Sequence, residues 1–377
     1  MAERKLGVGV LGLHEGRTLL VGLSHTIPDS VSHGRLLGPG EVGRAQFCRP
    51  VAGCDLRQEK IDACRAVCPD IFYTKDYADM LARPDVDVVV IYTPDSVHAE
   101  HIEQAMRAGK HVVCTKPLIN SVEGAARIVA AHKETGMQLM VGQSTRFFEP
   151  FRRQRAAFEQ GDVGQVEFVD AHYTHRMDWY YEKSPWVKET TDWIFLGLSH
   201  PIDLVRWYLG EIASVSAVSY RSALAQEHGA KSHDVYSAQF TAKDGRIGRA
   251  FGHYGLHELP SARNCIELML YGDKGTSQAQ YHDMRYRHTG PAGEEMTEDC
   301  LYAMRGYYFD NEVHGMHYGE FSNYTDAFCR SLIEGSRCSP DMKEGIDVFC
   351  LMESARLSAR EGRPVNPAEI RALIPDF

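Results

Sequence analysis

Short apolar runs of strand length alternate with helical segments through the first 145 residues, and no other feature of the chain constrains its fold more. The apolar runs cover residues 6–11, 47–54, 86–92, 111–115 and 138–142. Helical patterns lie between them at residues 58–67, 93–108 and 121–135. The run VDVVVIY at residues 86–92 is almost wholly β-branched or aromatic, which is typical of a strand covered on both faces. The alternation predicts a parallel, doubly wound sheet with ligands at the carboxyl ends of its strands.

The first strand and the turn after it decide where a nucleotide binds. Residues 7–12, GVGVLG, match the dinucleotide fingerprint G-x-G-x-x-G, whose glycines belong at the turn between a first strand and the next helix. The match lies within the strand-length run itself, so we expect Gly7 and Gly9 in the strand and the turn beginning at Gly12. Residues 12–16 then read GLHEG, with His14 in place of the second glycine and Gly16 as the third. We expect this turn to hold the pyrophosphate at the start of the following helix.

Asp55 indicates which cofactor the sheet binds. A carboxylate at the end of the second strand accepts hydrogen bonds from the adenosine ribose hydroxyls, which favours NAD and repels the extra phosphate of NADP. Arg57 lies two residues on and favours that phosphate. Asp55 follows Gly12 by 43 positions where about 20 are usual, and the proline- and glycine-rich residues 27–43 supply the insertion. We expect these residues to form a surface or subunit-contact loop.

Charge and hydropathy exclude several classes of partner. A formal net charge of −10 argues against nucleic acid and anionic membranes as partners. The opening MAERKLGVG has no signal-peptide character, and no apolar run approaches the roughly 18 residues of a membrane span. We therefore expect a cytoplasmic protein.

Metal ions and disulfides are not expected. The ten cysteines include no C-x-x-C pair. Cys64 and Cys68 are one helical turn apart, and we expect both to be reduced thiols that pack on a helix surface or in the core. His253 and His257 are four residues apart, but their surroundings have loop character. We expect no metal site.

A family resemblance appears in the segment AGKHVVCTKPLIN at residues 108–120. It resembles the A-G-K-H-V-x-x-E-K-P-L segment of the glucose-fructose oxidoreductase, inositol dehydrogenase and MocA-like (Gfo/Idh/MocA) family of NAD(P)-dependent oxidoreductases, with Thr115 in place of the glutamate. Residues 87–98, 141–147, 197–210 and 354–365 also resemble family segments, in the family's order. The last two read GLSHPIDLVRWYLG and SARLSAREGRPV.

The resemblance implies two domains of an α/β protein. We expect an N-terminal Rossmann domain with a doubly wound parallel sheet at residues 1–145. A C-terminal α+β domain with an open, mostly antiparallel sheet follows at residues 146–377 and binds substrate. Alternating segments at residues 165–175, 214–220, 235–240, 246–253 and 265–271 fit such a sheet independently. Because family members commonly pair through this sheet, we expect a homodimer or homotetramer.

Two residues are expected to carry the chemistry. Lys116 follows the fifth strand, where its ammonium would bind the reacting hydroxyl and stabilise the alkoxide. His200 lies early in a helix of the second domain, where a neutral imidazole would take the hydroxyl proton. Polyol dehydrogenases of the family usually carry an aspartate four residues before this histidine, and this chain has Leu196. We consider Asp192 as a spatial substitute, and a purely structural His200 remains the alternative.

Three of the four tryptophans cluster at residues 179–193 beside two tyrosines, which suggests a wall for a sugar ring. The alternative is that part of this cluster packs in the core. Lys183, His172, His175 and Arg176 are further candidates for binding hydroxyls. The predicted substrate-binding set is Lys116, His175, Trp179, Tyr180, Trp186, Asp192, Trp193 and His200. The predicted NAD-binding set is Gly12, Leu13, His14, Glu15, Asp55, Arg57, Thr93, Pro94, His98, Thr115, Lys116, Gln143 and Arg146.

The sequence favours an NAD-dependent dehydrogenase that oxidises a ring hydroxyl of a sugar, a sugar glycoside or inositol. One alternative is a redox-assisted enzyme that oxidises the ring transiently, eliminates the aglycone and returns the hydride from a recycled cofactor. Another alternative, from a different class, is a non-catalytic NAD-binding sensor. Accumulation of NADH distinguishes the first possibility from the second, and the presence of both Lys116 and His200 argues against the third.

Overall fold

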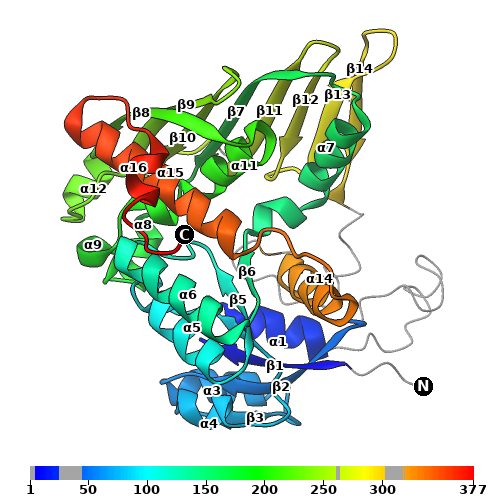
Figure 1. Ribbon diagram of the computed structural model, residues 1–377, viewed down its shortest axis with the longest axis vertical. Coiled ribbons are helices and arrows are strands. Elements are labelled where there is room, and N and C mark those ends of the chain that lie inside the picture. The colour runs from blue at the N-terminus through cyan, green and yellow to red at the C-terminus, as the bar shows by residue number, and fades with distance from the viewer. Residues whose placement is uncertain (1–4, 25–44, 260–263, 302–316, 318) are drawn as a thin grey trace.

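The computed structural model describes residues 5–24, 45–259, 264–301, 317 and 319–377. The expected insertion at residues 27–43 lies outside these residues. Among the residues described, no helix has the length and apolar character needed to cross a lipid bilayer. Figure 1 shows two sheets, one above the other, with helix α15 (Met342–Glu361) between them.

The first sheet is parallel, with the strand order β3-β2-β1-β4-β5-β6 expected of a Rossmann fold. Its strands are β1 (Leu6–Leu11), β2 (Cys48–Cys54), β3 (Phe72–Thr74), β4 (Val88–Ile91), β5 (His111–Thr115) and β6 (Leu139–Gly142). Every residue of β4 is buried, as its β-branched run predicts for a strand covered on both faces. The sequence reading missed only the short β3.

Helices connect these strands. They are α1 (Gly16–Ser24), α3 (Gln58–Arg65), α4 (Tyr77–Leu81), η1 (Asp95–Val97), α5 (His98–Arg107) and α6 (Val122–Thr135). The side chain of Ser121 caps α6 by accepting a hydrogen bond from the Gly124 N–H, and Gly136 ends the helix at φ +70°. The predicted helical segments are therefore confirmed to within a few residues.

The second sheet is mixed and mostly antiparallel, in the order β14-β13-β12-β11-β7-β10-β9-β8. Only β7 and β10 pair in parallel among its described strands. The strands are β7 (Val166–Thr174), β8 (Ile212–Tyr220), β9 (Val235–Ala242), β10 (Ile247–His253), β11 (Cys265–Gly272), β12 (Thr276–Gln280), β13 (Arg285–Thr289) and β14 (Glu295–Asp299). The predicted fold class is confirmed, although the sequence reading did not anticipate β12 to β14.

Helices cover one face of this sheet, and its other face is open. Helix α7 (Glu149–Gln160) packs on β12, α11 (Ser199–Leu209) on β7 and β10, and α15 on β8. The remaining helices are η2 (Ser144–Phe147), α8 (Asp178–Lys183), α9 (Val187–Thr190), α10 (Trp193–Leu196), α12 (Ala223–Glu227), α14 (Glu320–Glu334) and α16 (Pro367–Arg371).

Helix α14 returns to the first sheet although it follows the second sheet in the chain. It packs against α1, β2 and β6 (Figure 1). Phe321, Tyr324 and Phe328 are buried with residues of β1, β4 and β5 in one apolar cluster. The Rossmann unit is thus completed by a segment from the C-terminal half of the sequence.

A buried ion network joins the two halves at η2. Arg146 donates through Nε and Nη2 to the two carboxylate oxygens of Asp203, at 2.7 and 2.6 Å, and through Nη1 to Glu344 at 3.1 Å. Its guanidinium also lies 4.8 Å from the centre of the Trp207 ring. Arg146 and Asp203 are both buried. The network therefore ties the crossover segment to α11 and α15.

We expect Arg146→Met to lower the free energy of unfolding by about 3–5 kcal/mol, because it removes the bidentate partner of the buried Asp203 carboxylate and one of the cations beside Glu344. Urea denaturation at neutral pH followed by circular dichroism measures the loss. The matched control is Arg127→Met, which breaks an exposed pair with Glu103 and should cost under about 1 kcal/mol. Equal losses in the two variants would contradict this role of the network.

Candidate active site

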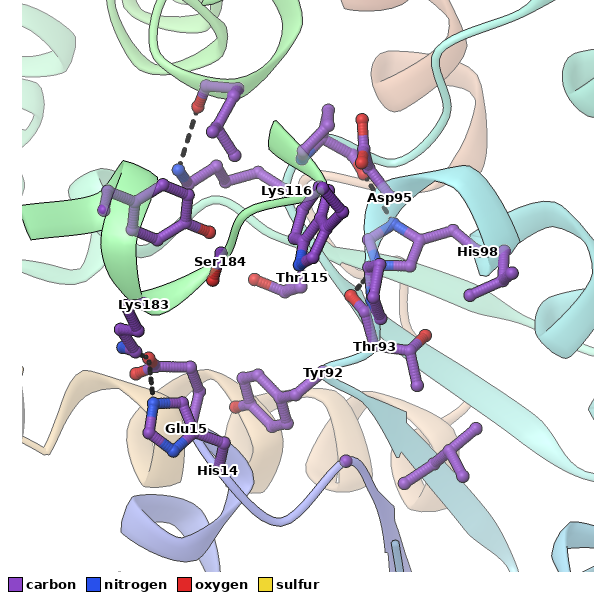
Figure 2. A pocket seen from close by; sticks show the side chains of 18 of the residues that line it. His14, Glu15, Tyr92, Thr93, Asp95, His98, Thr115, Lys116, Lys183 and Ser184 are labelled. Carbon is purple, nitrogen blue, oxygen red and sulfur yellow. Dashed lines mark hydrogen bonds and ion pairs between the residues drawn. The ribbon is translucent and has the colours of Figure 1, made fainter. Parts of the chain in front are cut away.

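One cavity of about 1340 Å³ lies between the carboxyl ends of the parallel strands and the segment around α8 to α10. Figure 2 shows residues of both halves around it, with His14, Glu15 and Tyr92 on one side and Lys183 and Ser184 opposite. Of the predicted site residues, the cavity is lined by Gly12, His14, Glu15, Asp55, Arg57, Thr93, Pro94, His98, Thr115, Lys116, His175, Trp179, Tyr180, Trp186 and Trp193.

The glycines of the first strand and turn have separate packing reasons. A Cβ on Gly7 would lie 1.8 Å from the carbonyl oxygen of Asp85, and one on Gly9 would lie 3.0 Å from the Met80 sulfur. Gly12 adopts φ +89°, and a Cβ there would lie 2.7 Å from the Tyr92 carbonyl oxygen. A Cβ on Gly16 would lie 2.5 Å from Val10 Cγ1, so Gly16 lets α1 pack on β1. The predicted register is confirmed, because β1 ends at Leu11 and the turn begins at Gly12.

Asp55 fixes this turn to the end of β2. Its Oδ2 accepts a hydrogen bond from the Leu13 N–H at 2.8 Å, and its Oδ1 accepts one from the Arg57 N–H at 2.9 Å. Leu13 itself is buried and lies outside the cavity lining, so it contributes its backbone and not its side chain. The Asp55 carboxylate thus has a structural role besides facing the cavity.

Lys116 lies at the carboxyl end of β5 and points across the cavity toward the second half. Its Nζ donates a hydrogen bond to the carbonyl oxygen of Leu196 at 2.9 Å (Figure 2). Burial lowers the pKa of Lys116 to about 8, although the carboxylates of Glu15 and Asp95 oppose the shift. The residue that replaces the family's aspartate therefore contacts the lysine through its backbone.

His200 is held neutral near Lys116. Its side chain is buried, and Nδ1 lies 2.8 Å from the Thr145 hydroxyl. Burial, with the charges of Lys116 and His317, holds the pKa of His200 well below its usual value. The expectation of a neutral imidazole is confirmed. His200 is not, however, among the described residues that line the cavity.

A second charged group, not anticipated from the sequence, lines the cavity at His317. His317 Nδ1 pairs with the Glu320 carboxylate. Burial alone would lower the pKa of His317, but the negative charges of Glu320 and Glu15 raise it. The spacing of His317 and Glu320 at the start of α14 was visible in the sequence. Nothing in the sequence indicated that α14 returns to the first sheet, and therefore the histidine was missed.

An ion pair crosses the mouth of the cavity. Lys183 of α8 lies 2.9 Å from the Glu15 carboxylate in the glycine turn (Figure 2). The charges of His317 and Lys183 lower the pKa of Glu15 against the effect of burial. The predicted sugar-binding lysine is thus paired with a predicted nucleotide-binding residue.

The aromatic cluster divides between the cavity and the core. Trp179 is 39% exposed and, with Tyr180 and Trp186, lines the cavity. Trp193 contributes to the lining but is otherwise a core residue, since it stacks on Tyr254 with ring centres 4.7 Å apart and is fully buried. His175 also lines the cavity and pairs through Nδ1 with Glu258.

Several predicted residues do not reach the cavity. Asp192 caps α10 by accepting a hydrogen bond from the Ile194 N–H and also accepts one from the Tyr236 hydroxyl, so it cannot replace the missing aspartate. Gln143 is buried next to Ser199, and Arg146 is held in the buried ion network. His172 lies on β7 one residue from the inward-facing Tyr173, and the alternation of a strand puts it on the open face of the sheet. None of these four is among the described residues that line the cavity.

Comparison with known proteins identifies the family. A model described as oxidoreductase family, NAD-binding Rossmann fold, matches residues 34–143, and that family's C-terminal alpha/beta domain matches residues 155–366. The chain belongs to the Gfo/Idh/MocA oxidoreductase family. The predicted recognition and the predicted NAD cofactor are both confirmed.

Individual members of the Gfo/Idh/MocA family align with most or part of the chain. An uncharacterized oxidoreductase of Bacillus subtilis is 31% identical over 215 residues, which is 55% of this chain and 59% of that protein. Inositol 2-dehydrogenase of Rhizobium meliloti is 25% identical over 88% of this chain and 98% of its own. The chain spans about half the length of the first curated relatives that it matches, 47–59%.

Solved structures of the Gfo/Idh/MocA fold superpose on nearly the whole chain. Levoglucosan dehydrogenase in complex with NADH and levoglucosan has a TM-score of 0.78 at 20% identity and covers 99% of this chain and 100% of its own. At this identity the likeness establishes the fold.

We expect Gly12→Ala to abolish NAD⁺ binding, because a Cβ at φ +89° is strained and meets the Tyr92 carbonyl. Gly9→Ala is the matched control, since its Cβ meets the flexible end of Met80 and leaves the turn intact. Isothermal titration with NAD⁺ and a melting curve for each variant separate loss of binding from loss of fold. Normal binding by the Gly12 variant would refute this assignment of the turn.

We expect the protein to bind NAD⁺ at least about tenfold more tightly than NADP⁺, a difference of about 1.4 kcal/mol. Asp55→Asn should reduce this preference, because it removes the carboxylate charge but keeps an acceptor for the Leu13 N–H. Asp62→Asn, on the exposed face of α3, should leave the preference unchanged. Tighter binding of NADP⁺ by the unmodified protein would overturn the expectation.

Proposed function

We propose that this chain is an NAD-dependent dehydrogenase that oxidises a ring hydroxyl of a sugar, a sugar glycoside or inositol. One observation carries the proposal: a single cavity extends from Gly12 and Asp55, past Lys116, to the aromatic wall formed by Trp179 and Tyr180. Such a cavity has a polar nucleotide end, a cation at its centre and flat apolar faces at the other end. The substrate proposal agrees with the name of the inositol 2-dehydrogenase relatives.

The residues at the nucleotide end suit NAD. The glycine turn opens at the carboxyl edge of the parallel sheet, and the Asp55 carboxylate lines the cavity there. Thr93 lies just after β4 and Thr115 ends β5, the next two strands of the order. When bound, the nicotinamide ring supplies the acceptor for a hydride.

Lys116 and His200 divide the work on the hydroxyl. The Lys116 ammonium donates a hydrogen bond to the hydroxyl oxygen and stabilises the negative charge that develops there. His200 takes the hydroxyl proton at Nε2, which requires that Nδ1 carries hydrogen and donates to Thr145 Oγ1. With the proton taken by His200 and the oxygen charge held by Lys116, the substrate carbon could become a carbonyl if bound NAD⁺ accepted its hydride. Thr145 is a positioning residue in this scheme because it selects the imidazole tautomer.

The remaining wall residues would orient the sugar. Trp179, Tyr180 and Trp186 offer flat faces to the C–H side of a ring, and His175, fixed by Glu258, offers a ring nitrogen for a hydroxyl. A panel of sugars, glycosides and inositols incubated with NAD⁺ and followed by absorbance and product mass tests the proposal. Accumulation of NADH matched to a ketone product supports net oxidation, whereas cleavage without NADH favours the redox-assisted alternative. Tight NAD⁺ binding without turnover on any compound favours the sensor.

Two further features complete the proposal. The open sheet face exposes Val218, Tyr220, Ile247 and Tyr271, at 70%, 64%, 48% and 41%, which suits pairing of two copies into a homodimer or homotetramer. All ten cysteines are free thiols, which suits the reducing cytoplasm.

We expect His200→Ala to lower kcat by about 10²- to 10⁴-fold, the range for loss of a general base, without loss of NAD⁺ binding. Thr145→Val should lower kcat less than His200→Ala does and should leave KM nearly unchanged, because it removes only the hydroxyl that selects the tautomer of the His200 ring. His175→Ala is the comparison and should act mainly on KM. If His175→Ala gives the larger loss in kcat and removes the acid limb of the pH profile, the base is the His175–Glu258 pair instead.

The pH profile should report Lys116. Because the pKa of Lys116 is about 8, the ammonium is lost as the pH rises through 8, and kcat/KM should fall there. Burial and the Lys116 charge hold the pKa of His200 well below its usual value, so its protonation should limit the rate only at a pH well below the ordinary histidine pKa of about 6.5. Lys116→Arg keeps a positive charge at alkaline pH, so its profile should lack the fall in kcat/KM near pH 8, although its maximum rate should be lower. Lys116→Ala should lower kcat at least as much as His200→Ala does. An alkaline limb unchanged in Lys116→Arg would contradict this role.

A further inference from the structure

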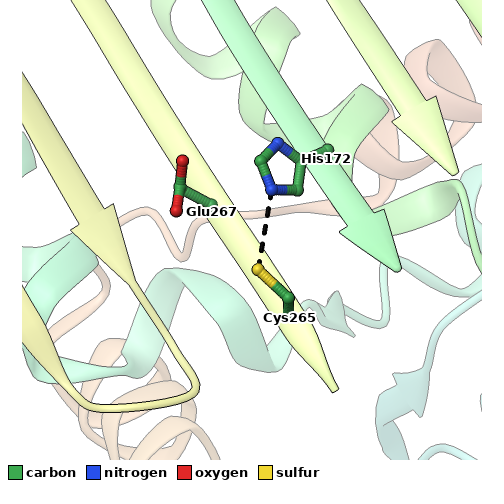
Figure 3. A group of neighbouring side chains, drawn as sticks. All are labelled: His172, Cys265 and Glu267. Atoms are coloured by element: carbon green, nitrogen blue, oxygen red, sulfur yellow. Dashed lines mark hydrogen bonds between the residues drawn. The ribbon is translucent and has the colours of Figure 1, made fainter. Parts of the chain in front are cut away.

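A mixed sulfur, nitrogen and oxygen cluster lies on the open face of the second sheet, outside the cavity. His172 on β7 pairs directly with Glu267 on β11 in the antiparallel register, and Cys265 is two residues from Glu267 on the same face. Figure 3 shows the Cys265 sulfur directed toward the His172 ring, with the Glu267 carboxylate to one side of them. One donor atom from each residue lies within 4.8 Å of the others.

The spacing of these donors matches the coordination geometry of zinc. The Cys265 sulfur lies 3.6 Å from His172 Nε2. With Zn–S and Zn–N bonds of about 2.3 and 2.05 Å, two corners of a tetrahedron are about 3.6 Å apart. The third donor, the Glu267 carboxylate, lies within 4.8 Å of the other two and ends a side chain with three rotatable bonds, so binding would draw it toward the ion. We propose that His172, Cys265 and Glu267 bind one Zn²⁺ ion, with water as the fourth ligand.

The surroundings supply an outer shell for such an ion. Gln280, directly opposite Glu267 on β12, donates from Nε2 to the Glu267 carboxylate at 2.6 Å and so orients it. The turn at residues 281–284 is fixed beside Cys265, because the Tyr281 N–H donates to the Ile266 carbonyl at 2.9 Å. Within this turn, His282 Nδ1 and Asp283 Oδ1 are buried and have no hydrogen-bond partner among the residues that the structure describes. Buried polar atoms of this kind are satisfied by a metal-bound water in many sites.

The chemistry of the donors selects the class of metal. A thiolate, an imidazole and a carboxylate together favour a borderline ion such as Zn²⁺ over Mg²⁺ or Ca²⁺, which prefer oxygen alone. Burial and the charges of Glu267 and Asp283 raise the pKa of Cys265 to about 12, so binding displaces one proton from the thiol to solvent. Because β7 and β11 lie at the centre of the sheet, the ion links its two central strands. The site is structural and is independent of the proposed dehydrogenase activity.

Cobalt titration of the full chain tests the proposal. After treatment with a chelator, we expect one Co²⁺ to bind per chain and to give a thiolate-to-cobalt charge-transfer band and the intense visible bands of tetrahedral Co²⁺. Zn²⁺ should displace it and abolish these bands. Cys265→Ser should eliminate the charge-transfer band, and His172→Gln and Glu267→Gln should weaken Co²⁺ binding by more than the 10- to 100-fold expected for an outer-shell partner.

Matched variants separate this site from unspecific binding. Cys338→Ser alters a partly exposed thiol away from the cluster and should leave the band and the Co²⁺ affinity unchanged. Gln280→Leu should weaken binding by roughly 10- to 100-fold while retaining the band. Circular dichroism checks that each variant is folded. If Cys265→Ser is unfolded, the loss of Co²⁺ affinity in His172→Gln, which changes a half-buried residue, tests the site in its place. Absence of the charge-transfer band in the unmodified protein, or its persistence in Cys265→Ser, would overturn the proposal, whatever the dehydrogenase activity of the variants.

Discussion

The buried ion network of Arg146, Asp203 and Glu344 is the interaction on which the geometry of the site depends. A bidentate guanidinium–carboxylate pair fixes both distance and orientation, and Asp203 lies one helical turn after His200 on α11. Arg146 immediately follows Thr145, which contacts the His200 ring. The same network thus holds the crossover segment, the helix that carries the histidine and the long helix α15 that spans both sheets. Its burial makes it costly to break and keeps the two halves in one relative position.

The nucleotide end of the cavity shows how one residue serves two purposes. Asp55 accepts the Leu13 N–H and thereby sets the glycine turn against the end of β2, and the same carboxylate faces the cavity. Gly12 and Gly16 are needed for close packing against Tyr92 and Val10. The middle glycine of the fingerprint is replaced by His14. The next residue, Glu15, pairs with Lys183 across the cavity. The turn is therefore built from fewer glycines than the fingerprint contains, with an ion pair to the other half of the molecule.

The loss of the family's aspartate changes the electrostatics of the centre of the cavity. With Leu196 at that position, no carboxylate of the described residues acts on the pKa of His200, which burial and the Lys116 charge hold well below its usual value. Lys116 donates a hydrogen bond to the Leu196 carbonyl, so this position contacts the lysine through its backbone. Histidines with carboxylate partners line this cavity elsewhere: His175 pairs with Glu258, and His317 pairs with Glu320. The charges of Glu320 and Glu15 raise the pKa of His317 against the effect of burial.

Local patterns in the sequence determined the first half of the fold, because strand runs, Ser121 and the glycines act on their immediate neighbours. They also determined the turn at Gly12 and the cavity positions of Lys116 and Asp55. Only the tertiary structure decided which polar residues face the cavity. Arg146 and Asp192 are bound to buried partners far away in the chain. His172 lies on the face of its strand that points away from the cavity, and His317 lies beside α14, which packs against the first sheet. These outcomes depend on contacts between segments more than 40 residues apart, and no local pattern records such contacts.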